Sequence, residues 1–446
     1  MNCSSNPNNI NIFLGNFDCE EYWSDSTFFK FPCVDFRHIK SLLQHLGELF
    51  IFCADSTDIL ILREKPDKNY IDYLKLLGVT IPQIITLENN NDRIPLTDLV
   101  INDSTMIKSL RNFVMSNRDR GKETFLVPYG TTIKESILSD KILAKGITNY
   151  HLSSLYNNKM YLKQLLTELN IPTPEWIICN GIDDFYLKGL DFINKHKHVI
   201  TKEIYGSGGS GLRRFDSTDQ FKYEMSYIQT RVVDSGMIVM EKWYESKCSY
   251  NYQYIASDNT VFPYICSQQI IDRNGRIIGS FFDLNKTNII FELHKNYGHK
   301  MAKKIVKNGY RGVIGFDSIV CENEKIFPII DINCRINLST IFFQIINKYF
   351  KTQYAIFFYK EYEIDKPIEF EKLIKRLGAS AYSSDTQEGV VILNYATLNR
   401  NIVTIGGKVG RIFYGIFSNK KERIKGLYDS VFKSIGVYDE FVEEDI

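Results

Sequence analysis

Residues 309–337, GYRGVIGFDSIVCENEKIFPIIDINCRIN, contain two apolar runs joined by a short polar stretch, Glu322 to Lys325. Apolar runs of this length on either side of a polar turn predict a β-hairpin. A turn centred on Glu324 places Asp317 directly opposite Asp331 on the neighbouring strand. Carboxylates on strands this hydrophobic require a partner, because burying an unpaired charge is costly.

The second strand of this hairpin carries two further polar side chains on the face of Asp331. Strand alternation places Asn333 and Arg335 there. Oxygen ligands such as Asp317, Asp331 and Asn333 suit Mg²⁺, which keeps several waters and also binds substrate phosphates; Mn²⁺ accepts similar ligands. We therefore predict a metal site with these three ligands. The alternative is an acidic pair on the solvent-facing side of a hairpin, and the hairpin alone leaves both open.

Composition excludes several classes of protein. The chain has 446 residues, of which 44% are hydrophobic, enough for two to four domains. Its 54 basic and 53 acidic residues give a net charge of +1, without the basic stripe of a nucleic-acid-binding protein. No apolar run reaches the ~18 residues of a membrane span, and the first residues lack signal-peptide features. We expect a cytoplasmic protein that binds neither nucleic acid nor membrane.

The nine cysteines show no CxxC spacing. Cys53, Cys266 and Cys321 fall in apolar, strand-like runs, where a reduced and buried thiol is the ordinary state.

The order of apolar and amphipathic segments divides the chain into three regions. Residues 1–150 alternate short apolar runs with amphipathic stretches, as a small α/β domain does. Residues 151–350 begin with a helix through NKMYLKQLLTEL and then become rich in strands, so we predict an α+β core. Residues 351–446 predict a small α+β extension that closes with an amphipathic helix. The fold class is α/β.

A glycine-rich loop lies in the segment 198–215, HVITKEIYGSGGSGLRRF. Its glycines match GxGxxG, but a dinucleotide-binding loop requires a helix to follow, and here the strand-like LRRF follows. A Walker phosphate-binding loop is excluded because Leu212-Arg213 stands where that motif has Lys-Ser/Thr. A protein kinase is excluded because the chain lacks the H-R-D and D-F-G motifs. The pattern predicts a strand–loop–strand hairpin, whose N–H groups can cover a polyphosphate.

Lys202 precedes the loop on its first strand and can reach phosphates as a point charge. We take it as a candidate phosphate ligand together with the loop itself: Tyr205, Gly206, Ser207, Gly208, Gly209 and Ser210. The alternative is a flexible surface turn rich in glycine and serine.

A third segment, MIVMEKWYESKCSYNYQYI (237–255), predicts two strands separated by a hinge. Such a hinge can present backbone groups to an adenine edge while an aromatic ring covers its face. The candidates are Glu241, Lys242, Trp243, Tyr244 and Glu245. The alternative is a surface hairpin with aromatic packing.

Taken in order, these motifs resemble the ATP-grasp superfamily: a helical lysine (Lys159), Lys202 with the glycine loop, the Glu241 hinge, Asp317, and an acid-x-Asn-x-Arg strand. The resemblance covers residues 150–345, preceded by a smaller α/β domain. The family usually has Glu where this chain has Asp331, which puts the number of metal ions in doubt. The family's ribose-binding acid falls near Cys248, with Glu245 as a substitute.

More narrowly, the chain resembles pheganomycin-type peptide ligases. The motifs are GNF near the start, Val127-Pro128-Tyr129, and VTIGGKVGRIFYGIFS near the end. The resemblance implies ATP- and Mg²⁺-dependent joining of a small-molecule carboxylate to an amine, amino acids or short peptides, through an acyl-phosphate with release of ADP. It also implies a homodimer and a role in natural-product biosynthesis.

By this resemblance, Asp317, Asp331 and Asn333 hold the metal, and Lys159 and Lys202 contact phosphates. Arg335 stabilises the transferring phosphoryl group or the tetrahedral oxyanion. Arg276 and Arg311 are weaker catalytic candidates, with a surface salt bridge as the alternative. Two other functions stay open: a kinase of the same fold, and a nucleotide-binding protein without turnover.

Overall fold

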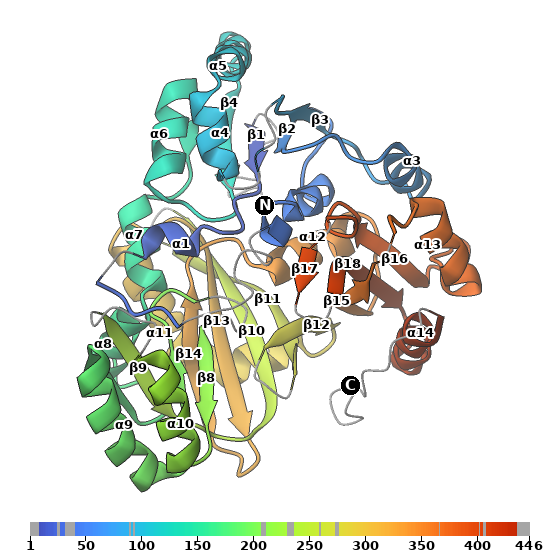
Figure 1. Cartoon of the computed structure of the whole chain (residues 1–446). Helices are drawn as coiled ribbons and strands as arrows, with labels where there is room; N and C mark the ends of the chain where they lie inside the picture. The colour runs from blue at the N-terminus through green and yellow to red at the C-terminus, as the bar shows by residue number, and fades with distance from the viewer. Residues whose placement is uncertain are drawn as a thin grey trace.

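The computed structural model describes residues 9–24, 27–31, 41–88, 91, 94–206, 211–229, 236–257, 260–272, 276–364, 366–400, 402–404 and 407–434. Their strands form three sheets, of five, four and nine strands. In Figure 1 the five-stranded sheet lies at the top, and the broad nine-stranded sheet occupies the centre.

The first sheet is wholly parallel, with the order β3-β2-β1-β4-β5. Its strands are β1 (Asn9–Leu14), β2 (Ile59–Leu62), β3 (Gln83–Thr86), β4 (Glu123–Pro128) and β5 (Lys145–Gly146). Its helices are α1 (Glu20–Trp23), α3 (Lys68–Leu76), α4 (Leu96–Asn102), α5 (Ser104–Asp119) and α6 (Ile133–Ile142). The strand order reverses between β1 and β4, and at such a point the carboxyl ends of the strands open a crevice for ligands.

The motifs GNF and Val127-Pro128-Tyr129 end these two strands. The side chain of Asn16 donates to the Gly130 carbonyl at 2.7 Å and accepts from the Gly130 N–H at 3.2 Å. The rings of Phe17 and Tyr129 stack with centroids 4.2 Å apart. Both motifs therefore fix the geometry of the crevice.

One apolar run differs from its expected conformation. The segment LFIFC, read as strand-like, lies in the 3₁₀ helix η1 (Leu46–Phe52), with Cys53 as its C-terminal residue. All seven residues of η1 are buried. Because an element that is apolar on every side shows no periodicity, its sequence cannot distinguish a buried strand from a buried helix.

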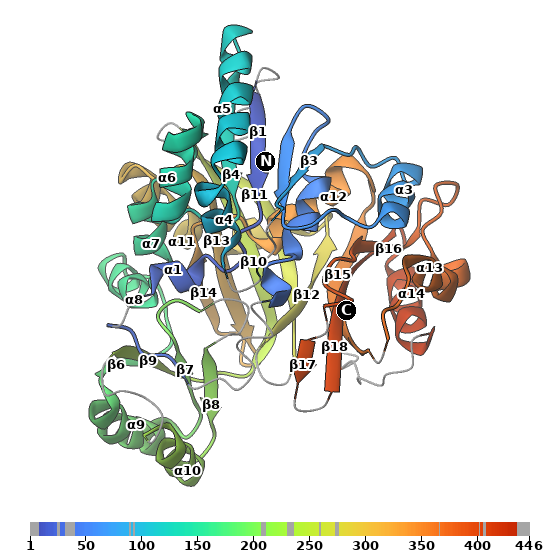
Figure 2. The same cartoon turned by 45° about the horizontal axis from the view of Figure 1, so that its top comes forward.

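The second sheet has the order β6-β9-β7-β8 and forms a small lobe with helices on one face (Figure 2). Its strands are β6 (Trp176–Asn180), β7 (Val199–Lys202), β8 (Leu212–Phe215) and β9 (Met237–Lys242), and its helices are α9 (Ile182–His196) and α10 (Thr218–Ile228). Helices α7 (Tyr150–Asn157) and α8 (Lys159–Glu168) lead into it. The antiparallel pair β7–β8 confirms the predicted strand–loop–strand hairpin.

The third sheet has the order β14-β13-β10-β11-β12-β15-β18-β16, with β17 beside β18. Its strands are β10 (Ser246–Ser257), β11 (Thr260–Ile271), β12 (Ile277–Asp283), β13 (Gly312–Cys321), β14 (Ile326–Asn333), β15 (Tyr354–Glu363), β16 (Gly389–Asn394), β17 (Ile402–Thr404) and β18 (Gly407–Ser418). Its helices are α11 (Thr287–Lys307), α12 (Leu338–Lys348), α13 (Phe370–Leu377) and α14 (Lys421–Ser434), with a short 3₁₀ turn η2 (Gly378–Ser380). The last strands of the chain thus extend the sheet that carries the predicted metal hairpin.

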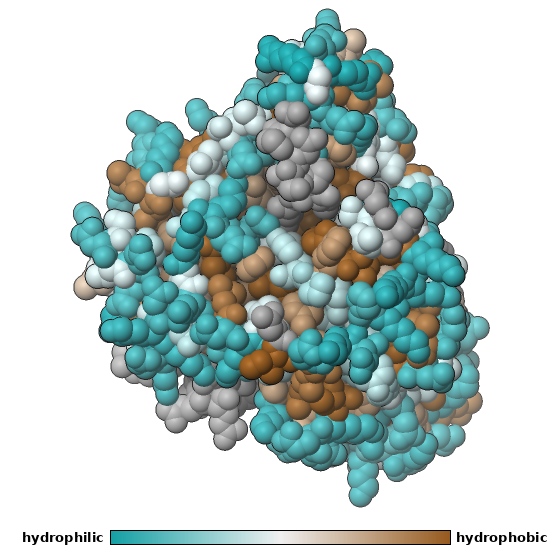
Figure 3. All heavy atoms as spheres, turned by 180° about the vertical axis from the view of Figure 1, so that it is seen from behind, coloured by the Kyte–Doolittle hydropathy of each residue, from teal (hydrophilic) through white to brown (hydrophobic). Residues whose placement is uncertain are grey.

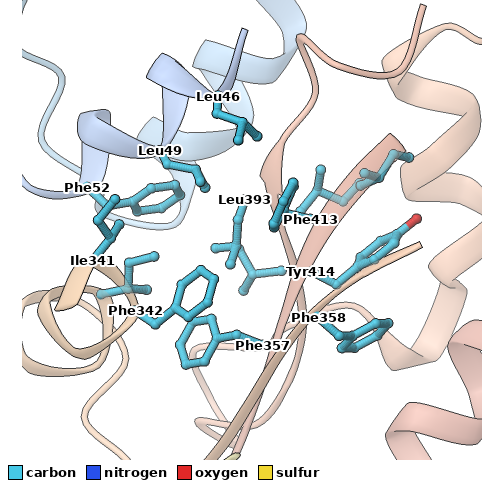
Figure 4. Packing of buried hydrophobic residues seen from close by; sticks show 14 of the residues in the cluster. Leu46, Leu49, Phe52, Ile341, Phe342, Phe357, Phe358, Leu393, Phe413 and Tyr414 are labelled. Carbon is cyan, nitrogen blue, oxygen red and sulfur yellow. The ribbon is translucent and has the colours of Figure 1, made fainter. Parts of the chain in front are cut away.

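The largest hydrophobic cluster joins the first and last thirds of the chain. Figure 4 shows Leu46 and Leu49 of η1 beside Leu393 and Phe413 of the C-terminal strands. Burial of this apolar area is the main force holding the two regions together. The face of the molecule seen in Figure 3 is largely hydrophilic. No helix in the described ranges is long and apolar enough to span a bilayer.

Candidate active site

The hairpin β13–β14 places its two acids side by side. Asp317 pairs with Asp331, and Gly315 pairs with Asn333, so the predicted pairing of the two acids is confirmed. The register shifts between Asp317 and Ile319, so that Val320 pairs with Ile326 nearer the turn. Glu324, at the predicted centre of the turn, has a positive φ of 62°. The two carboxylates therefore face one site.

Asp317 is held by three amide groups. Its Oδ1 accepts from Asn251 Nδ2 at 2.7 Å and from Gln269 Nε2 at 3.0 Å, and its Oδ2 accepts from Asn333 Nδ2 at 3.1 Å. Burial, followed by the charge of Asp331, raises the pKa of Asp317 to about 6. Two adjacent carboxylates, one of them buried, are stabilised when a cation lies between them.

The donor set fits a hard divalent cation. Among the residues that the structure describes, no three His, Cys, Asp or Glu side chains form a metal cluster. An ion here would thus take two carboxylates and the Asn333 amide oxygen, and complete its shell with water and phosphate oxygens, as Mg²⁺ does. Asn333 Oδ1 already accepts from Arg335 Nη2 at 2.9 Å, and its second lone pair remains for a cation.

Lys159 connects the acids to the glycine loop. It begins α8, whose first turn is capped by the side chain of Asn158. Its ammonium lies 3.0 Å from Asp331 Oδ2 and donates to the Gly206 carbonyl at 2.9 Å. A phosphate entering beneath the loop would meet this buried lysine next to the acid pair.

Lys202 lies in a buried ion cluster with Glu241 and Lys163. Its ammonium is 3.0 Å from Glu241 Oε2, and Lys163 Nζ is 2.9 Å from Glu241 Oε1. Burial opposes ionisation of Glu241, but the two ammonium groups hold its pKa below the usual value. The carboxylate is enclosed between two lysines, because an unpaired charge at this depth is unfavourable. Its contact with a purine or ribose stays a prediction.

The hinge after β9 is pinned by backbone hydrogen bonds. Lys242 N–H donates to the Glu175 carbonyl at 2.8 Å, and Trp243 N–H donates to the His198 carbonyl at 2.9 Å. The ring of Tyr244 packs against Phe327 with centroids 4.8 Å apart. The hinge thus has a fixed backbone course beside the hairpin that carries the acids.

Glu245 is exposed and accepts hydrogen bonds from two side chains beside the hinge. It accepts from Trp243 Nε1 at 2.9 Å and from Arg214 Nη2 at 2.8 Å, and Arg214 lies over the Trp243 ring. An acid at the surface beside an aromatic ring is compatible with a ribose contact.

Arg335 is buried and joins the third sheet to the first. Its Nε lies 2.7 Å from Glu20 Oε1, and its Nη1 donates to Tyr129 OH at 2.9 Å. Together with the bond to Asn333, these contacts fix the guanidinium beside the acid pair. Glu20 and Tyr129 come from the crevice at the ends of β1 and β4.

The predicted loop ligands lie only partly within the described residues. Ser207, Gly208, Gly209 and Ser210 lie outside them. The hydroxyl of Tyr205 lies 3.1 Å from Ser154 Oγ, which fixes the start of the loop against α7.

Two further predicted catalytic arginines, Arg311 and Arg276, make local hydrogen bonds. Arg311 donates to the Val306 and Tyr310 carbonyls at the end of α11, six residues or about 20 Å of strand before Asp317. Arg276 is exposed in the turn between β11 and β12, where its N–H donates to Asp272. These contacts lie at the ends of strands, and the catalytic roles of Arg311 and Arg276 stay predictions.

Four contributing residues went unpredicted: Lys163, Glu20, Asn251 and Gln269. Lys163 could have been found, because it lies one helical turn after Lys159. The other three reach the site from separate strands or from another domain, and their local sequence carries no signal.

Comparison with known families gives two matches. Residues 200–333 match the family described as L-aspartate–L-methionine ligase, ATP grasp, and residues 48–142 match the pre ATP-grasp domain. A curated relative, [butirosin acyl-carrier protein]–L-glutamate ligase of Niallia circulans, is 22% identical over 320 residues, which cover 70% of this chain and 68% of the relative.

Solved structures share the fold. An ADP complex of N5-carboxyaminoimidazole ribonucleotide synthetase aligns with a TM-score of 0.54 and 12% identity, over 95% of this chain and 96% of the other. The biotin carboxylase domain of Hydrogenobacter thermophilus 2-oxoglutarate carboxylase, in complex with MgADP, aligns with a TM-score of 0.53 and 12% identity, over 97% and 90%.

The family matches fall on the regions that the geometry marks as the crevice, the loop and the acid hairpin. The two matched segments therefore carry the pre ATP-grasp and ATP-grasp domains found in carboxylate–amine ligases.

Proposed function

We propose that this protein joins an amino acid or short peptide, as the carboxylate, to an amine and forms a peptide-like amide. The observation that carries the proposal is the double contact of Lys159 with Asp331 and with the Gly206 carbonyl, since it brings the start of the loop, a buried ammonium group and the acids together. The relatives named as L-aspartate–L-methionine ligase and as an L-glutamate ligase support an amino-acid substrate.

Two steps account for the product. A carboxylate oxygen attacks the γ-phosphorus, the bond to the β-phosphate oxygen breaks, and ADP leaves. The amine nitrogen then attacks the acyl carbon, inorganic phosphate leaves, and the nitrogen loses a proton. Mg²⁺ would supply charge neutralisation between the phosphates.

The chain's own residues orient these groups. Asp317, Asp331 and Asn333 would hold the ion, and Lys159 and Lys202 would contact phosphate oxygens. Arg335, fixed by three neighbours, would meet the developing oxyanion without reorganisation.

The nucleotide base would lie along the hinge. Because the N–H groups of Lys242 and Trp243 are committed to carbonyls, the hinge N–H offered to a purine edge would be that of Tyr244. Glu245 would accept from the ribose.

The remaining expectations extend this proposal. We propose a homodimer, a cytoplasmic location and a role in natural-product biosynthesis. We also retain the three regions 1–150, 151–350 and 351–446 as functional units, and the narrower resemblance to pheganomycin-type peptide ligases as a prediction.

The test crosses amino acids and short peptides as acids and amines with ATP and Mg²⁺, and follows ADP release and the mass of the products. An amide that forms only with acid, amine and ATP together supports the proposal. A phosphorylated product formed without amine identifies a kinase instead. ATP binding without ADP release for any pair identifies a nucleotide-binding protein without turnover.

A further inference from the structure

A cavity of about 330 Å³ lies at the carboxyl end of β2, apart from the acid hairpin. Apart from Leu96 of α4, its walls come from three parts of the chain. They are the η1 region with Gln44 and Glu48, the segment Arg63–Asp67 after β2, and the segment Tyr395–Arg400 after β16. The cavity is therefore closed only when the first and last regions of the chain pack together.

Glu48 is a buried acid in the wall of this cavity, only 3% exposed. Its Oε2 accepts from Tyr395 N–H at 3.0 Å, from Ala396 N–H at 2.8 Å and from Asn394 Nδ2 at 3.4 Å. Within the part of the chain that the structure describes, no hydrogen bond is recorded to Oε1. The carboxylate thus keeps one oxygen for a ligand.

The other charged groups in the wall are engaged in the fold. Arg400 pairs with Glu64 through two parallel bonds of 2.8 and 2.6 Å. Asp67 caps α3 by accepting from Asn69 and Tyr70 N–H groups.

Arg63 is likewise held by the fold. Its guanidinium donates to the side chain of Gln44 and to the backbone carbonyls of Asn91 and Ile94. Lys65, in contrast, is exposed and lines the cavity.

We infer that this cavity binds a small amine, with its cationic nitrogen against Glu48. A buried carboxylate whose recorded partners are all neutral gains most from a cation. The volume suits a molecule of amino-acid size. Lys65 would pair with a carboxylate of the same ligand, so free amino acids and short peptides belong to the class.

The cavity is separated from Arg335 by aromatic side chains. Phe17 lies 5.6 Å from Phe50 of η1 and 4.2 Å from Tyr129, by ring centroids, and Tyr129 in turn bonds Arg335. The cavity therefore lies on the far side of these rings from Arg335, and whether it binds an amine does not depend on the proposed ligase reaction.

The experiment measures binding to the full chain without ATP, by isothermal calorimetry. The probes are the amides of glycine, leucine and lysine, and their N-acetylated forms, which lack the cationic α-nitrogen; for lysine, both nitrogens are acetylated. We expect at least one amine to bind, and its acetylated form to bind at least tenfold more weakly. Equal binding of the two forms, or binding of none, overturns the inference.

Three variants complete the test. Glu48→Gln keeps an acceptor for the Tyr395 and Ala396 N–H groups but removes the charge, so amine binding should fall at least tenfold. Ala396→Leu narrows the cavity and should weaken binding without touching the charge. Glu292→Gln, an exposed acid on α11, is the matched control and should bind as the parent does. Undiminished binding by Glu48→Gln contradicts the assignment.

A last arm distinguishes two sources of the amine. With ATP, Mg²⁺ and an acid present, an amine that is a substrate is consumed as amide, and Glu48→Gln raises its KM. An amine that is a separate effector is recovered unchanged. Both results are compatible with an amine site in the cavity. Whether the site exists is decided by the binding measurements alone.

Discussion

Glu20 of the first parallel sheet unit and Arg335 of the nine-stranded sheet form an ion pair, with 2.7 Å between Oε1 and Nε. The two side chains are 13% and 5% exposed, so water screens the pair little. Together with the hydrogen bond from Arg335 to Tyr129, it links the β1–β4 crevice to the residues beside the acid hairpin.

Replacing Glu20 by Gln should reduce kcat/KM for the carboxylate about 10- to 100-fold. The guanidinium of Arg335, which we assign to the oxyanion, loses its counter-ion and one of the contacts that fix its orientation. Initial rates of ADP release measure the change, and nucleotide affinity should stay within about twofold. Glu292→Gln serves as control; an unchanged kcat/KM in Glu20→Gln would show that Arg335 does not need this partner.

Asp331→Asn should lower kcat by more than about 100-fold, because the site keeps its shape but loses one anionic ligand. Adenine nucleotide binding, measured by fluorescence with a labelled nucleotide in the absence of metal, should be largely spared. Adding Asn333→Asp to Asp331→Asn restores the number of negative charges at the site, so the double variant tests whether activity is recovered. Activity that persists in Asp331→Asn would refute the metal assignment.

Lys163→Met should destabilise the protein by about 3–5 kcal/mol, because it removes one of the two ammonium groups that pair with the buried Glu241 carboxylate. Urea unfolding measures the loss. The double variant Lys163→Met with Glu241→Gln should recover part of the stability, because the uncompensated charge is gone. Full additivity of the two changes would mean that the residues do not interact as described.

Glu48 makes stability depend on pH in a defined direction. Burial, opposed by the Tyr395 and Ala396 N–H groups and by Arg400 and reinforced by Asp67, raises its pKa from 4.5 to about 7. Between pH 4.5 and pH 7, the folded state therefore keeps a proton on Glu48 that the unfolded state has lost. The contribution of Glu48 to the free energy of unfolding is thus complete below pH 4.5 and is lost as pH rises through 7.

The free energy of unfolding of Glu48→Gln should therefore rise relative to that of the parent protein as pH increases, by up to roughly 3 kcal/mol above pH 7. Chemical unfolding of both proteins at pH 5 and pH 8 gives the comparison. A constant difference between them at the two pH values would contradict the pKa shift.

The sequence predicts elements whose signal is local. The pairing of Asp317 with Asp331 was predictable from the turn, although the register shift between Asp317 and Ile319 was not. The loop hairpin follows from glycines between two strands. Contacts between distant segments carry no such signal. Nothing near Glu20 indicates that it meets Arg335, and nothing near Glu48 indicates that the N–H groups after β16 converge on it. For LFIFC the sequence predicts a strand where the structure has a 3₁₀ helix, because a segment buried on every side shows no periodicity.

The ion pairs of Lys159, Lys202 and Arg335 have a consequence for the affinity of ATP. Carboxylates of the protein itself form ion pairs with the cations that would receive phosphates. Nucleotide binding is then an exchange of anions: each new contact to a phosphate replaces an existing one to Asp331 or Glu241. The affinity for ATP should be lower than its number of contacts implies, and mutations that remove an internal carboxylate can tighten nucleotide binding while abolishing turnover.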